Sequence, residues 1–220
     1  ETKKEADFIT KHYHVTSEKI LVIPNGADTP ETNSQMIFDV IGKRCQYALE
    51  VARFDKNKNQ INVIRGLKGT NTEVVFAGGP DFSDNGYYEE CLEIAKDSPN
   101  IHFLGWLDTE SELLKSAYVN AKVLIAPSFH ETFGLSIVEG AMAGAVPVIS
   151  NTLPILDYDV FHDCLTIDPN NPEDIRRQLE KAMLIENTPA FRAKIQEAFS
   201  WANIAEQHLI LYRGLTNESF

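Results

Sequence analysis

The chain has 220 residues, of which 43% are hydrophobic and 24% are charged, a composition typical of a folded globular domain and not of a disordered or fibrous chain. The 32 Asp and Glu residues outnumber the 20 Lys and Arg residues, and the formal net charge is −12. Binding to nucleic acid or to an anionic membrane surface needs a basic footprint, so this balance argues against both. An anionic ligand would need a few local cations to attract it.

The three cysteines, Cys45, Cys91 and Cys164, are scattered and form no C-x-x-C pair. This pattern favours reduced cysteines over a disulfide framework or a zinc site. No apolar run has the length of a membrane-spanning helix, and the chain begins with neither Met nor a signal-peptide pattern. We therefore expect a cytoplasmic location and a polypeptide that continues upstream of residue 1.

Taken in chain order, residues 1–14 resemble the end of a helix, and residues 20–23 read as a strand stopped by the turn signal Pro24-Asn25-Gly26. Residues 29–43 are polar and weakly patterned, which indicates a connection. Six short apolar runs follow, at residues 47–51, 74–77, 101–104, 123–126, 146–149 and 164–167. Runs that are apolar at consecutive positions are expected for parallel strands covered on both faces.

Helical patterns separate these runs. Tyr88, Cys91, Leu92 and Ala95 recur with a 3.6-residue period. A second helix is expected after the start signal at residues 171–174, with an apolar stripe at positions 175, 179, 182 and 183. Residues 188–214 form a long amphipathic helical stretch that we expect to break near Ser200-Trp201.

This alternation predicts an α/β fold: a Rossmann-like, doubly wound, mostly parallel sheet of about six strands with helices on both faces. We expect three parts, namely a helix of an upstream domain at residues 1–19, the sheet domain at 20–187, and C-terminal helices at 188–220 that return to the upstream domain. Ligands of such sheets bind outside the carboxyl ends of the strands, so the loops after the strands are the candidate site.

Residues 126–140 run from a predicted strand into a predicted helix that should begin near Thr132 or Phe133. A helix N-terminus attracts anions, and Gly134 would let a ligand approach the backbone. Glu131 and Glu139 bracket this point, about 12 Å apart along a helix and roughly 80° apart around it. They could hold two ends of one ligand; alternatively, Glu131 only partners the helix dipole and Glu139 is a solvated surface acid.

Arg53 and Lys58 directly follow the first long apolar run, so both should lie at the carboxyl edge of the sheet. In so acidic a chain, they are candidates for neutralising a diphosphate, with Arg53 as a fork donor and Lys58 as a point charge. The alternative is a solvated turn, which is how we interpret Lys56.

An ordered set of motifs resembles the family-4 retaining glycosyltransferases of the GT-B fold. The resemblance spans most of residues 20–185 and is to the carboxyl-terminal, nucleotide-sugar-binding half of such enzymes. The motifs are Asn25-Gly26-Ala27-Asp28, Arg53 with Lys58, Ala77-Gly78-Gly79-Pro80, Phe103-Leu104-Gly105, Pro127-Ser128, Glu131-x7-Glu139, Ala143-Gly144 and Pro147-Val148-Ile149-Ser150.

The resemblance implies a role for each matched position. Arg53 and Lys58 match the pair that binds the donor diphosphate, Glu131 the acid that contacts the donor sugar near the reacting centre, and Glu139 the acid that holds the ribose. Backbone groups of Phe133, Gly134 and Leu135 match those that meet the sugar and phosphate. The base would be read near Gly105 and Trp106, while His130, Gly79 and Asn25 are further candidates.

Two departures from the family pattern stand out. After Ser150 the family usually has a Gly-Gly pair and a Glu, whereas this chain reads Asn151-Thr152-Leu153, so sugar contacts from that loop are in doubt. Gly140 stands where the family commonly has Ala, a change that costs about 0.5–1 kcal/mol of helix propensity.

The expected function is therefore binding of a UDP-, GDP- or ADP-linked sugar and, with the upstream domain, transfer of the sugar to a hydroxyl of a glycan, lipid-linked sugar or small molecule, without a metal or other cofactor. The isolated chain should bind the nucleotide but turn nothing over. A nucleotide-sugar 2-epimerase of the same fold and a non-catalytic nucleotide-sugar-binding module remain the alternatives.

Overall fold

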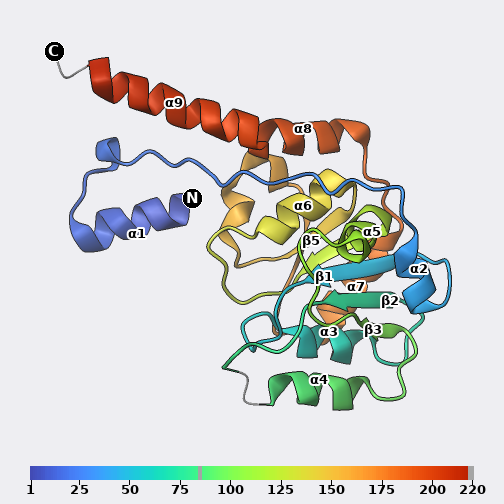
Figure 1. Cartoon of the computed structure of the whole chain (residues 1–220). Coiled ribbons are helices and arrows are strands. Elements are labelled where there is room, and N and C mark those ends of the chain that lie inside the picture. Colours follow the sequence, from blue (N-terminus) through green and yellow to red (C-terminus); the bar gives the residue numbers. More distant parts are fainter. Residues whose placement is uncertain (84–85, 218–220) are drawn as a thin grey trace.

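The computed structural model describes residues 1–83 and 86–217. Its centre is a six-stranded sheet, all of whose pairings are parallel, in the order β3-β2-β1-β4-β5-β6 (Figure 1). The strands are β1 (Tyr47–Val51), β2 (Glu73–Ala77), β3 (Ile101–Phe103), β4 (Val123–Ala126), β5 (Val146–Ser150) and β6 (Leu165–Ile167). The predicted Rossmann-like α/β fold is confirmed, and each of the six apolar runs forms a strand with bounds that differ by one residue at most.

Helices cover both faces of the sheet. The helices of the described residues are α1 (Lys3–Tyr13), α2 (Met36–Ile41), α3 (Gln60–Leu67), α4 (Tyr87–Ala95), α5 (Glu112–Asn120), α6 (Leu135–Ala143), α7 (Pro172–Met183), α8 (Pro189–Phe199) and α9 (Trp201–Asn217), with short 3-10 turns at Ser17–Lys19, Pro154–Asp157 and Asp159–Phe161. Helices α3, α4 and α7 bury their apolar stripes on one face, and α2, α5, α6 and α8 on the other. The strands, buried between two layers, are apolar on both faces as predicted.

The strand order reverses between β1 and β4, because the chain winds first toward β3 and then returns to the other side of β1. A crevice forms at such a reversal, outside the carboxyl ends of the two strands. The loops that follow β1 and β4 therefore define where a ligand would bind.

Two local predictions were wrong. Residues 20–23 form no strand; the segment is extended but Leu21 is 62% exposed, and pairing begins only at Ala27, which forms a single bridge with Ser200. Within the predicted connection at residues 29–43 lies α2, because Ile37 and Ile41, one turn apart, are buried in the core against the α5 side of the sheet.

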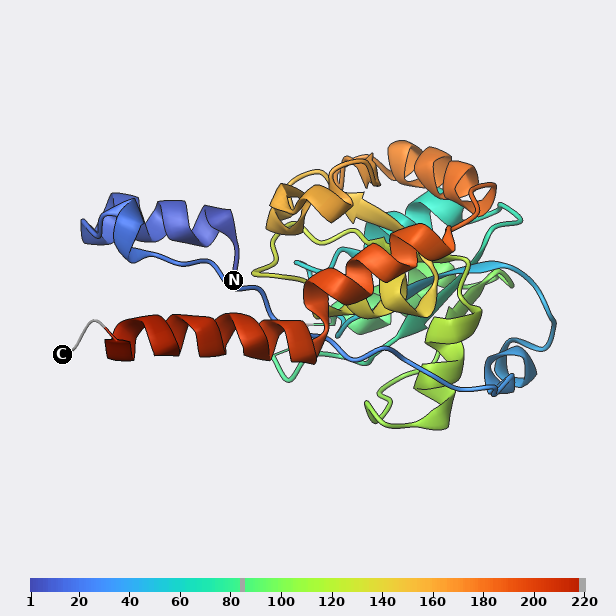
Figure 2. The ribbon, with the colours of Figure 1, turned by 90° about the horizontal axis from the view of Figure 1, so that it is seen from above.

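The predicted terminal helices are present. The N-terminus of helix α1 is capped by a capping box between Thr2 and Glu5. The C-terminal helical stretch breaks at Ser200, as expected. Helices α1 and α9 project from the same side of the sheet domain (Figure 2). No helix within the described residues is long and apolar enough to cross a membrane. The three-part division of the chain stays a prediction, and residues 218–220 of its last part lie outside the described residues.

Candidate functional site at the carboxyl ends of the strands

The loop between β1 and α3 carries Lys58 and is held in place by the side chain of Asn59. Asn59 adopts a left-handed backbone (φ 65°) and its buried amide donates to the carbonyls of Pro127 (3.1 Å) and Pro169 (2.7 Å). A second amide, that of Asn57, bonds both the carbonyl (2.8 Å) and the N–H (2.9 Å) of His130. The loops after β1 and β4 are thereby joined, which fixes where their charged side chains meet.

Lys58 and Glu131 form an ion pair at this junction. Their side chains are 20% and 17% exposed, and the hydroxyl of Ser128 donates a 2.7 Å hydrogen bond to the same Glu131 oxygen that Lys58 contacts. The two residues that the sequence analysis assigned to phosphate and sugar thus lie in direct contact. Dissolved salt weakens the attraction within a largely buried ion pair less than it weakens the attraction within a surface pair. The ion pair and the Ser128 hydrogen bond together hold the Glu131 carboxylate in place.

Arg53 lies at the same edge but its guanidinium is already paired. Its Nε is 2.7 Å from Asp55 and 3.0 Å from Asp81, and hydrogen bonding to Asp55 raises the pKa of Arg53. Two carboxylates therefore offset one cation. A phosphate bound here would have to share Arg53 with these acids or displace them.

The helix after Glu131 begins at Leu135, later than the predicted start near Thr132 or Phe133. Phe133 is 2% exposed and packs edge-on against Tyr158 and Phe199, while Gly134 has φ 99° and caps the helix. Because burial of Phe133 and the left-handed Gly134 hold this segment out of the helix, Glu131 lies in a loop. The predicted helical offset between Glu131 and Glu139 therefore does not apply, whereas the exposed start of α6 at Leu135 does lie at the strand edge.

Glu139, on the second turn of α6, is half-buried and not a solvated acid. The Tyr118 hydroxyl of α5 donates a 2.7 Å hydrogen bond to it, and burial raises the pKa of its carboxyl despite that bond. It borders a hollow of about 680 Å³, which is also lined by Asp28, Thr29, Pro30, Glu31, Val51, Thr109, Glu110, Leu114, Lys115 and Tyr118. A nucleoside is of a size that such a hollow can take.

Gly79 and Trp106 meet at the edge of the same crevice, but do not line that hollow. A Cβ atom on Gly79 would lie 2.4 Å from the Trp106 ring, so the indole is packed directly against the Gly79 backbone. Gly105 has φ 68° and its carbonyl accepts from the N–H of Gly78 (2.9 Å). The side chains around Glu139 that sequence reasoning missed, among them Thr109 and Lys115, follow Trp106 within one loop and helix.

Asn25 and His130 are not part of the ion pair. The side-chain amide of Asn25 donates a 2.8 Å hydrogen bond to the carboxylate of Glu1, the residue that precedes α1 by two positions. His130 is exposed and held through its backbone, and it lines a hollow of about 470 Å³ together with Glu131 and residues of α1 such as Phe8 and Ile9. Helix α1 thus forms one wall of the hollow that Glu131 also lines, a long-range arrangement that no local pattern could reveal.

Glu50 is a further residue that sequence reasoning overlooked. It is the fourth residue of β1, is 3% exposed, and lines a small hollow with Lys58, Ser128 and Glu131. A single acid within the apolar run at residues 47–51 was the available signal.

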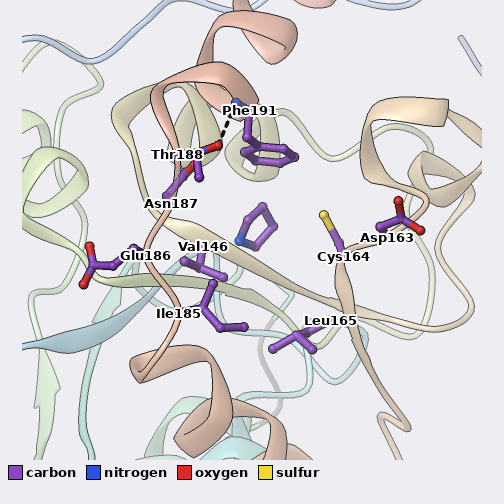
Figure 3. Close-up of a pocket in the computed structure, with 10 residues that line it drawn as sticks. Val146, Asp163, Cys164, Leu165, Ile185, Glu186, Asn187, Thr188 and Phe191 are labelled. Carbon is purple, nitrogen blue, oxygen red and sulfur yellow. Dashed lines mark hydrogen bonds between the residues drawn. The ribbon is translucent and has the colours of Figure 1, made fainter.

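A separate apolar hollow of about 190 Å³ lies at the opposite edge of the sheet, where β5 and β6 begin (Figure 3). The Phe191 ring and the Cys164 sulfur face it, and burial raises the pKa of that thiol to about 12. No disulfide bond joins two cysteines within the described residues. Among the described residues no group of three or more His, Cys, Asp or Glu side chains is arranged to hold a metal ion.

With this geometry in hand, comparison with known proteins gives the class. The fold is that of the carboxyl-terminal half of a GT-B glycosyltransferase, and the model of the family "Glycosyl transferases group 1" matches residues 38–199. The chain belongs to that family.

Curated relatives carry the same class in their names. An uncharacterized glycosyltransferase of Methanocaldococcus jannaschii is 27% identical over 158 residues, which are 67% of this chain and 38% of that protein. The serotype-specific mannosyltransferase WbdA of Escherichia coli is 34% identical over 107 residues, 47% of this chain and 13% of that one. The chain therefore spans well under half the length of these relatives.

Solved structures agree on the fold. A glycosyltransferase from Rickettsia africae has a TM-score of 0.83 at 16% identity, covering 99% of this chain and 63% of that one. HepE of Anabaena, solved in complex with UDP, has a TM-score of 0.81 at 15% identity, covering 97% of this chain and 62% of that one.

Proposed function

We propose that this chain is the donor-binding half of a retaining glycosyltransferase, and that a nucleoside-diphosphate sugar binds in the crevice between the loops after β1 and β4. The observation that carries the proposal is the meeting of Lys58 and Glu131 at the reversal of strand order, beside the exposed start of α6. Family membership supports the transferase class, and the UDP complex of HepE supports a nucleotide ligand for this fold.

In this proposal the diphosphate lies between Lys58 and the N–H groups at Gly134 and Leu135. Lys58 then exchanges Glu131 for phosphate, and the freed Glu131 carboxylate faces the donor sugar. Departure of the diphosphate leaves negative charge on the β-phosphate, which Lys58, Arg53 and the helix dipole would stabilise electrostatically without a metal.

Glu139 receives the ribose hydroxyls, since its carboxylate borders the hollow of about 680 Å³ next to the start of α6. The base then lies deeper in that hollow, toward Thr109 and Lys115 and beyond the predicted Gly105-Trp106 edge. UDP, GDP and ADP are the candidate nucleotides. The acceptor hydroxyl and its transfer belong to the complete protein.

Calorimetric titration with UDP, GDP and ADP tests the proposal. The double variant Arg53→Ala/Lys58→Ala should weaken binding of the preferred nucleotide about ten- to a hundredfold, the scale of one charged hydrogen bond (about 1.5–3 kcal/mol). Lys56→Ala removes an exposed cation from the same loop and should leave the affinity within about twofold. The proposal fails if no nucleotide binds, or if the double variant binds as tightly as the unchanged chain.

The complete protein distinguishes transfer from the epimerase alternative. A transferase consumes the nucleotide sugar and releases nucleoside diphosphate in the presence of an acceptor, and the new linkage keeps the donor's anomeric configuration. Formation of an epimeric nucleotide sugar, or tight binding with no product at all, would favour the epimerase or the non-catalytic module.

A further inference from the structure

Strand β1 carries a buried acid that the proposed donor site does not use. Side chains alternate along a strand, and Ala48 packs on the face covered by α3, α4 and α7, so Glu50 points to that face as well. Glu50 is 3% exposed, and neither of its carboxyl oxygens has a hydrogen-bond partner among the described residues. A buried carboxylate without partners is costly, so the group needs an explanation.

Among the described residues, the charged side chains that act on Glu50 are those of Lys58, Glu131 and Asp55. Glu50 lines a small hollow with Lys58, Ser128 and Glu131, so it adjoins the Lys58–Glu131 ion pair. Asp55 of the same loop and the Tyr87 hydroxyl of α4 are the further titratable groups that interact with it.

Gln60, the first residue of α3, adjoins Glu50 as well. Its amide nitrogen donates to the Arg53 carbonyl (3.1 Å), and its buried Oε1 has no partner. A protonated Glu50 is a donor, so one proton could satisfy a buried oxygen of each residue, whereas an ionised Glu50 can only accept.

Burial raises the pKa of Glu50 well above its ordinary value, and the Glu131 and Asp55 charges act in the same direction, whereas Lys58 and Gln60 act in the opposite direction. The carboxylates of Glu131 and Glu50 can both attract the Lys58 ammonium. While Glu50 is neutral, Glu131 alone competes for Lys58 on this side. Once Glu50 is ionised, a second negative charge lies on the buried side of the ammonium.

We propose that Glu50 is a positioning residue for Lys58: with its proton in place, the ammonium is directed toward Glu131 and the mouth of the site, and loss of the proton to solvent draws the ammonium inward, away from a bound diphosphate. The consequence for the diphosphate rests on the proposed function, whereas the placement of Lys58 does not. Glu50 touches no substrate in this scheme.

Selective acetylation of lysines from pH 6 to 10, followed site by site by mass spectrometry, tests the placement of Lys58. The rate at Lys58 is divided by the rate at Lys181, an exposed lysine of α7 that serves as internal reference. Glu50→Gln keeps the shape of the neutral acid and cannot ionise. Its Lys58 ratio should equal that of the unchanged chain at pH 6 and exceed it about tenfold at the alkaline end, because a carboxylate beside the ammonium holds its proton and position.

The matched control is Glu73→Gln. Glu73 is also a buried strand glutamate (8% exposed), but it lies at the opposite end of the sheet with Lys43 and His102. This variant should follow the unchanged chain at Lys58 throughout. A Lys58 ratio that is the same in the unchanged chain and in Glu50→Gln over the whole pH range would overturn the inference, as would an equal change in Glu73→Gln.

Nucleotide affinity, measured over the same pH range, gives the functional consequence. Binding of the preferred nucleoside diphosphate should weaken at the pH where the Lys58 ratio falls, in the unchanged chain and not in Glu50→Gln. If the Lys58 ratio behaves as expected but no nucleotide binds at any pH, the proposed function fails and the placement of Lys58 by Glu50 stands. If nucleotide binds with identical pH profiles in both chains, Glu50 does not position Lys58 for phosphate.

Discussion

The hydroxyl of Tyr118 donates a 2.7 Å hydrogen bond to the carboxylate of Glu139, joining α5 to α6 at the border of the largest hollow of the candidate site. Tyr118 is 4% exposed, so this bond is shielded from water. Shielded hydrogen bonds to charged groups orient a side chain more firmly than exposed ones. The bond fixes the orientation of the Glu139 carboxylate at the border of the hollow, where a ligand could accept or donate a hydrogen bond.

Glu139→Gln should weaken nucleotide binding by about 1.5–3 kcal/mol, because a neutral amide replaces a charged acceptor for the ribose hydroxyls. Calorimetric titration of the preferred nucleotide measures this directly. Thermal unfolding of the same variant is the control, since a misfolded protein would lose affinity without regard to the ribose. An affinity equal to that of the unchanged chain would refute the ribose role.

Tyr118→Phe should weaken binding less, by about 0.5–1.5 kcal/mol, since it removes only the bond that orients Glu139. The double variant with Glu139→Gln tests the connection. If Tyr118 acts through Glu139, the combined loss should fall short of the sum of the two single losses. Fully additive losses would mean that Tyr118 affects the nucleotide independently.

The buried Glu50 should make the chain less stable as the pH rises. Its pKa is raised in the folded state by burial, so from about pH 4.3, where an unfolded glutamate ionises, up to the folded pKa the native chain binds one more proton than the unfolded chain. The free energy of unfolding then falls by up to about 1.4 kcal/mol per pH unit from this group. Urea unfolding of the unchanged chain and of Glu50→Gln at a series of pH values should show a shallower slope in the variant. Parallel slopes would contradict the prediction.

Gly140→Ala should destabilise the chain although alanine is the better helix former. A Cβ at Gly140 would lie 2.8–2.9 Å from three side-chain carbons of Leu124 in β4, so α6 would have to move off the sheet. We expect a loss of about 1–3 kcal/mol from overpacking, against a propensity gain of about 0.5–1 kcal/mol.

Gly214→Ala is the matched control for that substitution. Gly214 lies within α9 and a Cβ there would meet nothing within 4 Å. The change should be neutral or slightly stabilising. If chemical unfolding showed both substitutions to be stabilising, close packing of Gly140 on Leu124 would not be the reason for glycine at that position.

The fold was predictable because burial between two helical layers makes each strand apolar at most of its positions, a signal that a single sequence carries without any alignment. The location of Lys58 and Glu131 at one edge of the sheet followed from the rule that carboxyl ends of parallel strands share an edge, whereas their ion pair was not predicted. The start of α6 did not follow, because the burial of Phe133 against Tyr158 and Phe199 is a tertiary contact. The strand propensity of residues 20–23 led to a wrong prediction, because a segment of β-forming residues becomes a strand only where it can pair with the free edge of a neighbouring strand.

Gly140 shows how a sequence comparison can point to a position and misjudge its cause. The helix-propensity argument treats glycine there as a small loss that is tolerated. The approach of α6 to Leu124 makes glycine a requirement of packing. The position of α1 across the hollow from Glu131 could not be found by any such argument, because the residues that line this hollow are more than a hundred positions apart in the sequence.

The segment that links α1 to the sheet domain and the junction of α8 with α9 lie side by side. The N–H of Ala27 donates to the carbonyl of Phe199 (2.9 Å), and the indole of Trp201 lies so close to Gly26 that a Cβ there would be 2.4 Å from the ring. The segment that leads from α1 into the sheet domain is therefore packed directly on the junction of α8 and α9. Because the Lys4 ammonium also donates to the Thr152 carbonyl (2.9 Å), α1 is tied to the sheet domain at two separate places.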